Sequence, residues 1–421
     1  MKKILDFCEK YAPEILVLLL CIPVLIMQRG IDSYHTSFYF TDYSTGFGGK
    51  KLLGEICSLW FPEVVRKRHI FPLIYSVLAL MIGLFAWFLG KTIRQHKTNQ
   101  FAVTLFIAIY LLSPYSFIGI INSACVDFYL CTAVLCFLYL YIKHRGTWFY
   151  YLFTILILCT ACLTHHIFCN IYFPLIFALF IYDIFVNERG RKKNIALYSA
   201  ITLCLFVLFC AIAFFSTMNI DFETYYHQLQ TRTTESISAL SWKPALYYEF
   251  YAKLSEHITA YVAPIWKYNI ARFVLTLIVF APLWVMLWTP WLLVIKNATN
   301  KSERLCYILM QVSLHLIILP AYIMAVDYLR WTFAYCFCQI CLFLVVYSSK
   351  ESAMKQQFDN LVSWLSNYKI ILLIFAIYIC SFDLVDSASA APIVDRLCEL
   401  IGLKWQVNEV LPVDVVTNIM Q

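Results

Sequence analysis

Residues 195–215 read IALYSAITLCLFVLFCAIAFF, an uncharged stretch that comes shortly after the basic sequence RGRKK at 189–193. A helix of about 20 apolar residues is long enough to cross the hydrocarbon core of a bilayer. Lysine and arginine clustered beside such a helix are typical of its cytoplasmic end. The stretch therefore predicts a membrane-spanning helix that begins near the cytoplasm.

The whole chain shares this apolar character. Of its 421 residues, 62% are apolar and only 14% are charged, whereas about a quarter of the residues of a soluble domain are charged. Such a composition excludes a cytosolic enzyme, a disordered chain and a nucleic-acid-binding module. The net charge of +7 is accordingly expected in cytoplasmic loops, and nucleic acid is not expected as a partner.

Apolar runs divided by polar turns predict an all-α polytopic transmembrane bundle of about 11 spans over residues 1–382, followed by an outer tail, 383–421. The spans are expected near 13–28, 71–89, 101–119, 128–142, 148–164, 169–185, 195–215, 270–295, 305–326, 332–348 and 370–382. Lysine and arginine placement puts the N-terminus in the cytoplasm and the C-terminus outside.

Two large loops, 29–70 and 216–269, fall on the outer side in this topology. Loops carry function more often than the elements that they connect, so the outer face is where we expect chemistry. Segment 50–65 has clustered apolar residues typical of an interfacial helix, as do 354–365 and 392–403. The 17 cysteines lie mostly inside apolar runs, where cysteine acts as a small hydrophobe, so no disulfide framework is expected.

The first outer loop contains Asp32 and the run TDYSTGFGGKKLLG at 41–54. Its glycines permit positive φ and close approach of the backbone to a ligand, and Lys50 and Lys51 suit a phosphate. Asp42 is placed to act as a base or as a metal ligand beside that phosphate. The alternative is a turn that leads into a basic anchor for the interfacial helix.

Short turns between spans supply the other polar candidates. Asp127 either caps the following helix or serves the site. His165 and His166 either bind a sugar hydroxyl or phosphate and move a proton, or make structural contacts between helices. In the outer loop 216–269, aromatic residues suit either a sugar ring or the membrane interface, and Arg232 does not stand out from its background.

The turn DYLRW at 327–331 is the last candidate. Asp327 and Arg330 are spaced to pair on one helical face, while arginine is also well shaped for bidentate contact with phosphate. Trp331 suits a sugar ring or the aromatic belt of the membrane. We expect substrate binding here.

DYSTGFGGKKLLG, the paired histidines that end a span and DYLRW together resemble bacterial membrane proteins of polysaccharide loci. A first span followed by a long outer loop with an early Asp and an interfacial helix also resembles the GT-C superfamily of membrane glycosyltransferases. This resemblance implies a location in the bacterial plasma (inner) membrane, a polyprenyl-phosphate-linked sugar donor and a glycan or lipid acceptor. It also implies an acidic residue in the first outer loop as general base or metal ligand, which falls on Asp42 or alternatively Asp32, with Asp127 as the second acidic residue. The first loop has no DxD signature, so a divalent metal cofactor is left open.

Two other functions fit parts of this pattern. An O-antigen or exopolysaccharide repeat-unit polymerase would also need cationic residues on the outer face. A lipid-linked glycan flippase or transporter would need charged residues deep within the spans and broken helices near the midplane. The chain has few charged residues inside its spans, although Pro114, Pro174, Pro282 and Pro320 could kink helices.

Overall fold

The computed structural model describes residues 7–8, 10–27, 36–94, 100–123, 126–186, 191–216, 219–233, 246–247, 250, 258–259, 266–298, 300–324, 328–349, 353–381 and 392–403. The helices of this part are α2 (Ala12–Met27), η1 (Ser37–Tyr39), η2 (Tyr43–Thr45), α4 (Leu52–Trp60), α5 (Lys67–Arg94), α6 (Gln100–Leu111), α7 (Phe117–Ser123), α8 (Asp127–His144), α9 (Trp148–Thr164), α10 (Phe168–Ile171), α11 (Phe173–Val186), α12 (Arg191–Phe215), α13 (Phe222–Arg232), α16 (Trp266–Val279), α17 (Ala281–Asn297), α18 (Lys301–Met324), α19 (Tyr328–Tyr347), α20 (Ala353–Leu365), η7 (Ser366–Tyr368), α21 (Lys369–Cys380) and α22 (Pro392–Leu400). Among these residues there is no β-strand, and one isolated bridge joins Val65 to Thr233. The predicted all-α class is confirmed.

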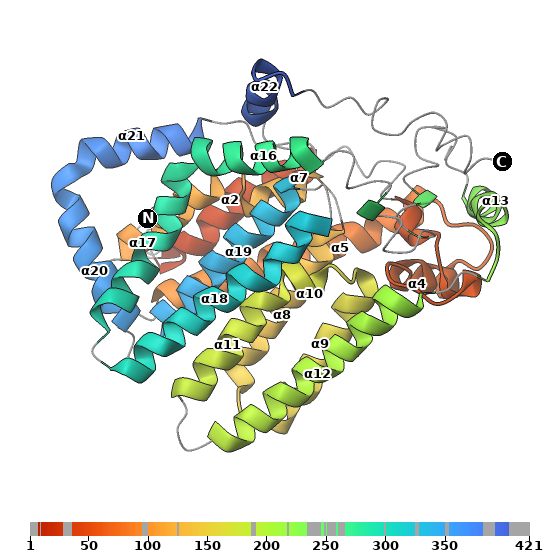
Figure 1. The fold of residues 1–421 in the computed structure, drawn as a ribbon, viewed down its shortest axis with the longest axis horizontal. Helices are drawn as coiled ribbons and strands as arrows, with labels where there is room; N and C mark the ends of the chain where they lie inside the picture. Colours follow the sequence, from red (N-terminus) through yellow and green to blue (C-terminus); the bar gives the residue numbers. More distant parts are fainter. Residues whose placement is uncertain are drawn as a thin grey trace.

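Long helices lie side by side in one bundle, and shorter helices cross or cap it (Figure 1). Five helical stretches are long and apolar enough to cross a membrane, and the bent pair α16 and α17 makes a sixth if it counts as one span. Shorter apolar helices lie beside them, among them α2, α9 and α11. The chain is therefore a helical integral membrane protein.

Three of the predicted spans are divided in the structure, and each division lies at a proline. Pro114 separates α6 from α7, Pro174 is the second residue of α11, and Pro282 is the second residue of α17. Proline has no N–H to donate and clashes with the preceding turn, which favours a helix break before it or a new helix start at it. The fourth proline named above, Pro320, lies inside α18 without dividing it. The break between α16 and α17 bends the chain by 70°, and the Tyr378 hydroxyl of α21 donates to the Val279 carbonyl there, at 2.8 Å.

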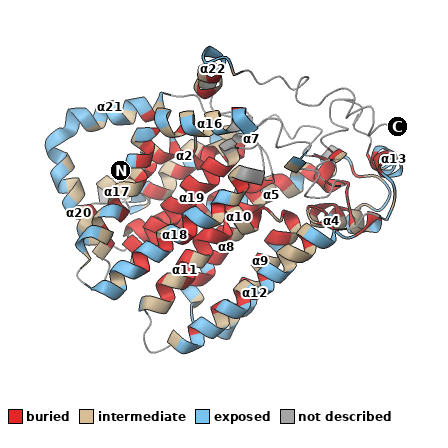
Figure 2. Ribbon diagram, in the orientation of Figure 1, coloured by how far each residue is buried: buried red, intermediate tan, exposed pale blue. Residues whose placement is uncertain are grey.

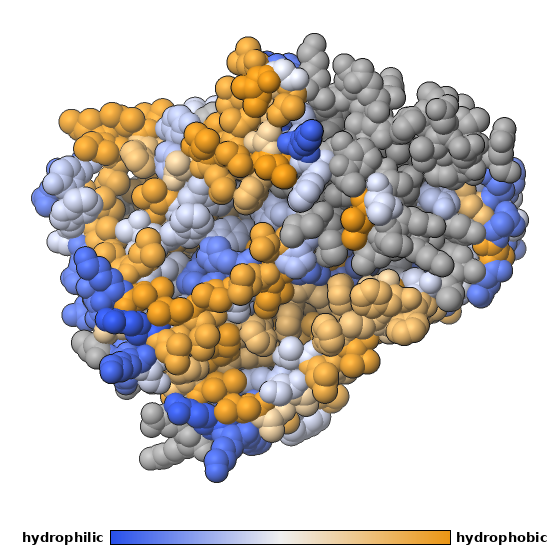
Figure 3. Space-filling view, viewed as in Figure 1, coloured by the Kyte–Doolittle hydropathy of each residue, from blue (hydrophilic) through white to orange (hydrophobic). Residues whose placement is uncertain are grey.

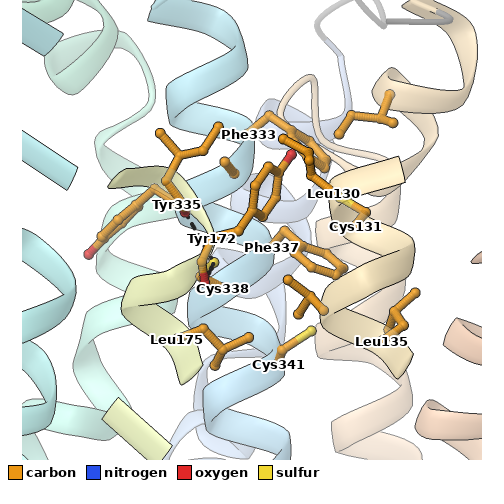
Figure 4. Packing of buried hydrophobic residues seen from close by; sticks show 14 of the residues in the cluster. Leu130, Cys131, Leu135, Tyr172, Leu175, Phe333, Tyr335, Phe337, Cys338 and Cys341 are labelled. Carbon is orange, nitrogen blue, oxygen red and sulfur yellow. Dashed lines mark hydrogen bonds between the residues drawn. The ribbon is translucent and has the colours of Figure 1, made fainter. Parts of the chain in front are cut away.

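The core of the bundle surrounds α19. Of the 18 residues in its apolar stretch, Arg330–Tyr347, 94% are buried. Figure 2 shows α19, α8 and α11 as mainly buried helices, with α12 and α21 largely exposed. In the close view of Figure 4, Phe333, Phe337 and Cys341 of α19 pack beside Leu130 and Leu135 of α8. Side chains from several helices thus interlock around one central helix.

The exposed faces of α12 and α21 are apolar. Leu203 and Phe206 of α12 and Ile370 of α21 are each at least 60% exposed, and hydrophobic atoms cover large parts of the face shown in Figure 3. Such a surface is stable in contact with lipid chains and costly in contact with water.

The end of the bundle where α11 meets α12 has its own buried polar cluster. Asp183, on α11, is almost completely buried and accepts hydrogen bonds from Tyr198 at 2.5 Å and from Asn194 at 3.1 Å, both on α12. Arg145, which follows α8, lies 3.1 Å from the same carboxylate. Asp183 is therefore the centre of a contact among three segments.

Candidate functional site

The loop 41–51 follows η1 and is shaped by its own side chains. Asp42 caps η2: its carboxylate accepts hydrogen bonds from the Ser44 N–H at 3.0 Å and from the Ser44 hydroxyl. The backbone dihedral φ is 123° at Gly46 and 67° at Lys50, positive values that residues other than glycine rarely adopt. Gly46 therefore allows a backbone conformation that most other residues would strain, and Lys50 adopts a conformation that is uncommon for a residue with a side chain.

The Lys51 side chain is buried and holds this loop together through two hydrogen bonds. Its Nζ donates to Thr45 Oγ1 at 3.0 Å and to the Gly46 carbonyl at 2.8 Å. Burial lowers the pKa of Lys51 to about 8, and the nearby negative charge of Asp42 opposes that shift. A neutral amine still has two N–H groups to donate, so both hydrogen bonds persist when the proton is lost.

The loop rests on α4 and α13. A Cβ on Gly54 of α4 would lie only 2.0 Å from the Thr41 carbonyl oxygen, so this glycine permits direct contact between helix and loop. Thr41 Oγ1 lies 2.9 Å from the Tyr225 hydroxyl of α13, and the Tyr43 N–H donates to Glu55 of α4 at 3.1 Å. Helix, loop and distant helix are therefore one packed unit.

The two long loops of the sequence meet in this unit. Arg232, the last residue of α13, forms an ion pair with Asp42. The Arg232 carbonyl accepts from the Val65 N–H at 2.9 Å, and the Asn219 N–H donates to the Thr45 carbonyl at 3.0 Å. Residues about 190 positions apart thus fix the charge environment of the Asp42 carboxylate.

The paired histidines lie at the end of α9, beside the same loop. The Lys50 N–H donates to the Leu163 carbonyl at 3.2 Å, and a Cβ on Gly49 would lie 2.8 Å from His166 Nδ1. His165 is buried, and its Nδ1 accepts from the Ile167 N–H at 3.3 Å. The glycines therefore allow the loop to pack directly against the histidine turn.

The electrostatic environment of His165 favours a neutral imidazole. Burial lowers its pKa well below the usual value, and the positive charges of Lys50, His166 and Arg330 lower it further. A neutral histidine can accept or donate a proton through its ring nitrogens.

Asp127 and Arg330 form a second ion pair at this end of the bundle. Arg330 Nε donates to Asp127 Oδ2 at 2.5 Å, and the Tyr172 hydroxyl donates to Oδ1 at 3.4 Å. Asp127 is fully buried as the first residue of α8, and its carboxylate binds other helices. Trp331 is also buried, and the Arg330 guanidinium lies 5.3 Å from its ring centroid.

Most of the predicted site residues are therefore brought to one end of the bundle. Asp42 and Lys51 share the loop, Lys50 reaches the histidine turn, and Arg330 links the histidine turn to Asp127. Asp32 and Asp327 lie outside the described residues.

No metal centre is evident in the described part of the chain. It contains no group of three or more His, Cys, Asp or Glu side chains placed to hold a metal ion.

Arg232 is the main site residue that sequence reasoning did not single out. It carries no motif, and its partner Asp42 lies in a different loop. The only available signal was its position in an outer loop rich in aromatic residues, which several neighbouring charged residues shared.

No family model, curated protein or solved structure matches this chain. The functional assignment accordingly depends on the residues of the chain itself.

Proposed function

We propose that this chain is a membrane glycosyltransferase that takes a sugar from a polyprenyl-phosphate carrier at the outer membrane face, in surface glycan assembly. The observation that carries the proposal is the convergence of Asp42, His165 and Arg330, with their partners, at one end of the bundle. A carboxylate, a neutral imidazole and several cations are the groups needed to move a proton and to stabilise an anionic leaving group.

In the proposed topology, α6 with α7, α10 with α11 and α16 with α17 each form one broken span, which brings the total to about 11 spans. The N-terminus lies in the cytoplasm, and the tail 383–421 lies outside. Figure 3 shows hydrophilic atoms at α13 and also where α18 begins and where α11 meets α12; the sequence assigns the basic turns to the latter end.

Asp42 is the proposed general base, which takes the proton from the acceptor hydroxyl as that oxygen attacks the sugar. The ion pair with Arg232 holds the Asp42 carboxylate in position within the loop. An anionic donor would compete with Asp42 for the Arg232 guanidinium. Arrival of the donor phosphate would therefore release the Asp42 oxygen that accepts the proton.

The leaving group in this reaction is a polyprenyl phosphate, whose negative charge grows as the bond to the sugar breaks. Lys50 and Arg330 lie beside the histidine turn and supply positive charge there. Asp127 orients the Arg330 guanidinium through its 2.5 Å hydrogen bond. Lys51 acts mainly by holding the loop in shape, since its ammonium is buried against the loop oxygens.

The test is transfer by an Asp42→Asn variant, which keeps the acceptor oxygen for Ser44 but cannot act as a base. The variant is expressed in a strain lacking the native chain, and lipid-linked glycans are measured by mass spectrometry. We expect loss of the sugar addition with normal expression. The matched control is Asp221→Asn, at the exposed N-cap of α13, which should restore the wild-type glycans.

Two outcomes would overturn the proposal. Full transfer by Asp42→Asn would remove the assigned base. Accumulation of complete, unpolymerised repeat units in the strain without the chain would identify a polymerase in place of a transferase.

A further inference from the structure

Two cysteines flank the histidine turn with their sulfur atoms in contact. Cys162 lies in the last turn of α9 and Cys169 in α10, and their Sγ atoms are 3.6 Å apart. Both thiols are free; Cys162 is fully buried and Cys169 is partly exposed. A disulfide has an S–S length of about 2.0 Å, so the two sulfur atoms need to approach by about 1.5 Å.

The backbone between the two cysteines is fixed by hydrogen bonds. The His165 N–H donates to the Ala161 carbonyl at 3.0 Å, and the Phe168 N–H donates to the His165 carbonyl at 3.0 Å. The Ile167 N–H donates to His165 Nδ1. Because this network defines the chain reversal, it also holds the two thiols face to face.

We propose that Cys162 and Cys169 form an oxidisable pair whose product is an intramolecular disulfide across the histidine turn. This inference does not depend on the proposed glycosyltransferase activity. Cys159 of α9 and Cys204 of α12 are a second neighbouring pair, but they lie on two long helices, with no short turn between them to hold the thiols together.

The oxidant in this step is a molecule that itself carries a disulfide. The Cys169 thiol is the more accessible of the two; it loses its proton and attacks one sulfur of the oxidant, which releases the first thiolate. The Cys162 thiolate then attacks the Cys169 sulfur of the mixed disulfide and releases the second thiolate. Two thiols of the protein are oxidised, the disulfide of the oxidant is reduced to two thiols, and the two protons pass to the released thiolates.

Closure of this disulfide has a direct route to the loop 41–51. The segment between the two cysteines contains Leu163, whose carbonyl accepts from the Lys50 N–H, and His166, which lies against Gly49. A movement of about 1.5 Å at the sulfur atoms is shared between the two cysteine side chains and that segment. The disulfide would therefore lie directly beside the contacts that position Lys50.

The test uses the purified full-length protein in detergent, treated with 4,4′-dithiodipyridine and compared with an untreated sample. Remaining thiols are alkylated, the protein is digested with chymotrypsin, and linked peptides are identified by mass spectrometry. We expect Cys162 linked to Cys169 as the dominant intramolecular product, reversible by dithiothreitol. The link should be lost in Cys162→Ser and in Cys169→Ser, while Cys136→Ser, a partly exposed cysteine of α8, retains it.

Alkylation of both Cys162 and Cys169 as free thiols after oxidation would overturn the proposal. So would a dominant link from either of them to Cys159, Cys204 or a second molecule. Mass mapping of the wild-type protein alone distinguishes these products, so the result does not require that the serine variants fold.

Discussion

Arg330 and Asp127 are separated by 203 residues in sequence, yet the Arg330 Nε donates to the Asp127 carboxylate at 2.5 Å. Asp127 has no exposed surface, and the Arg330 side chain is 15% exposed. An isolated charge is very costly at such a site, whereas a paired charge is tolerated. The pair consequently fixes the start of α19 against the start of α8, the two helices that meet in the core.

Removing only one of the two charged partners should destabilise the protein far more than removing both. We expect Asp127→Asn and Arg330→Gln each to cost about 3–5 kcal/mol, because each leaves a buried charge without its partner. The double variant should cost less than either single variant, because it leaves no unpaired buried charge. Thermal unfolding in detergent, followed by fluorescence-detected size exclusion, measures all four proteins. Additive losses would show that the two residues act independently.

The glycine at position 54 should not accept a side chain. In Gly54→Ala the new Cβ would lie 2.0 Å from the Thr41 carbonyl oxygen, so α4 and the loop 41–51 must separate. Overpacking of this kind lowers the free energy of unfolding by about 1–3 kcal/mol. The contacted atom belongs to the backbone, which can move away less easily than a side chain.

Gly83→Ala provides the matched control for that substitution. Gly83 lies within α5, and a Cβ there would meet no atom within 4 Å. Alanine is a better helix former than glycine by about 1 kcal/mol, so this variant should be at least as stable as the wild type. Equal thermal stability of Gly54→Ala and Gly83→Ala would contradict the close packing of α4 on the loop.

Features that depend only on residues close together in the sequence were predicted better than contacts between distant segments. The helices over 148–164 and 195–215 follow from apolar runs of sufficient length, and prolines mark the places where three spans divide. The turn that leads into α4 is likewise local, but the capping of η2 by Asp42 was not predicted. Arg232 and the cluster around Asp183 could not be predicted, because their partners come from segments whose approach depends on the whole bundle.

The C-terminal helix α22 is tied to α16 by a charged contact. Asp395 Oδ1 lies 3.1 Å from Arg272 Nε and accepts from the Tyr268 hydroxyl at 3.0 Å, while Cys398 on the same helix is fully buried. We expect Asp395→Asn to loosen α22 and to speed maleimide labelling of Cys398, because thiol reactivity increases with exposure. Glu399→Gln, which removes an exposed charge from the same helix, should label at the wild-type rate. Equal labelling of Asp395→Asn and the wild type would show that apolar packing alone holds α22.

His165 should make the protein less stable in mild acid. Because burial and neighbouring cations depress its pKa in the folded protein, the unfolded chain binds a proton near the usual value of about 6.5 while the folded chain does not. Stability contributed by the neutral imidazole is therefore complete above about pH 6.5 and falls as the pH drops below it. His165→Asn can retain an acceptor for the Ile167 N–H but has no group that titrates in this range. We expect the unfolding temperature to fall less for this variant than for the wild type between pH 7.5 and pH 5.5, values chosen about one unit either side of the usual histidine pKa. Identical falls in the two proteins would mean that His165 is already protonated in the folded state or is exposed to solvent.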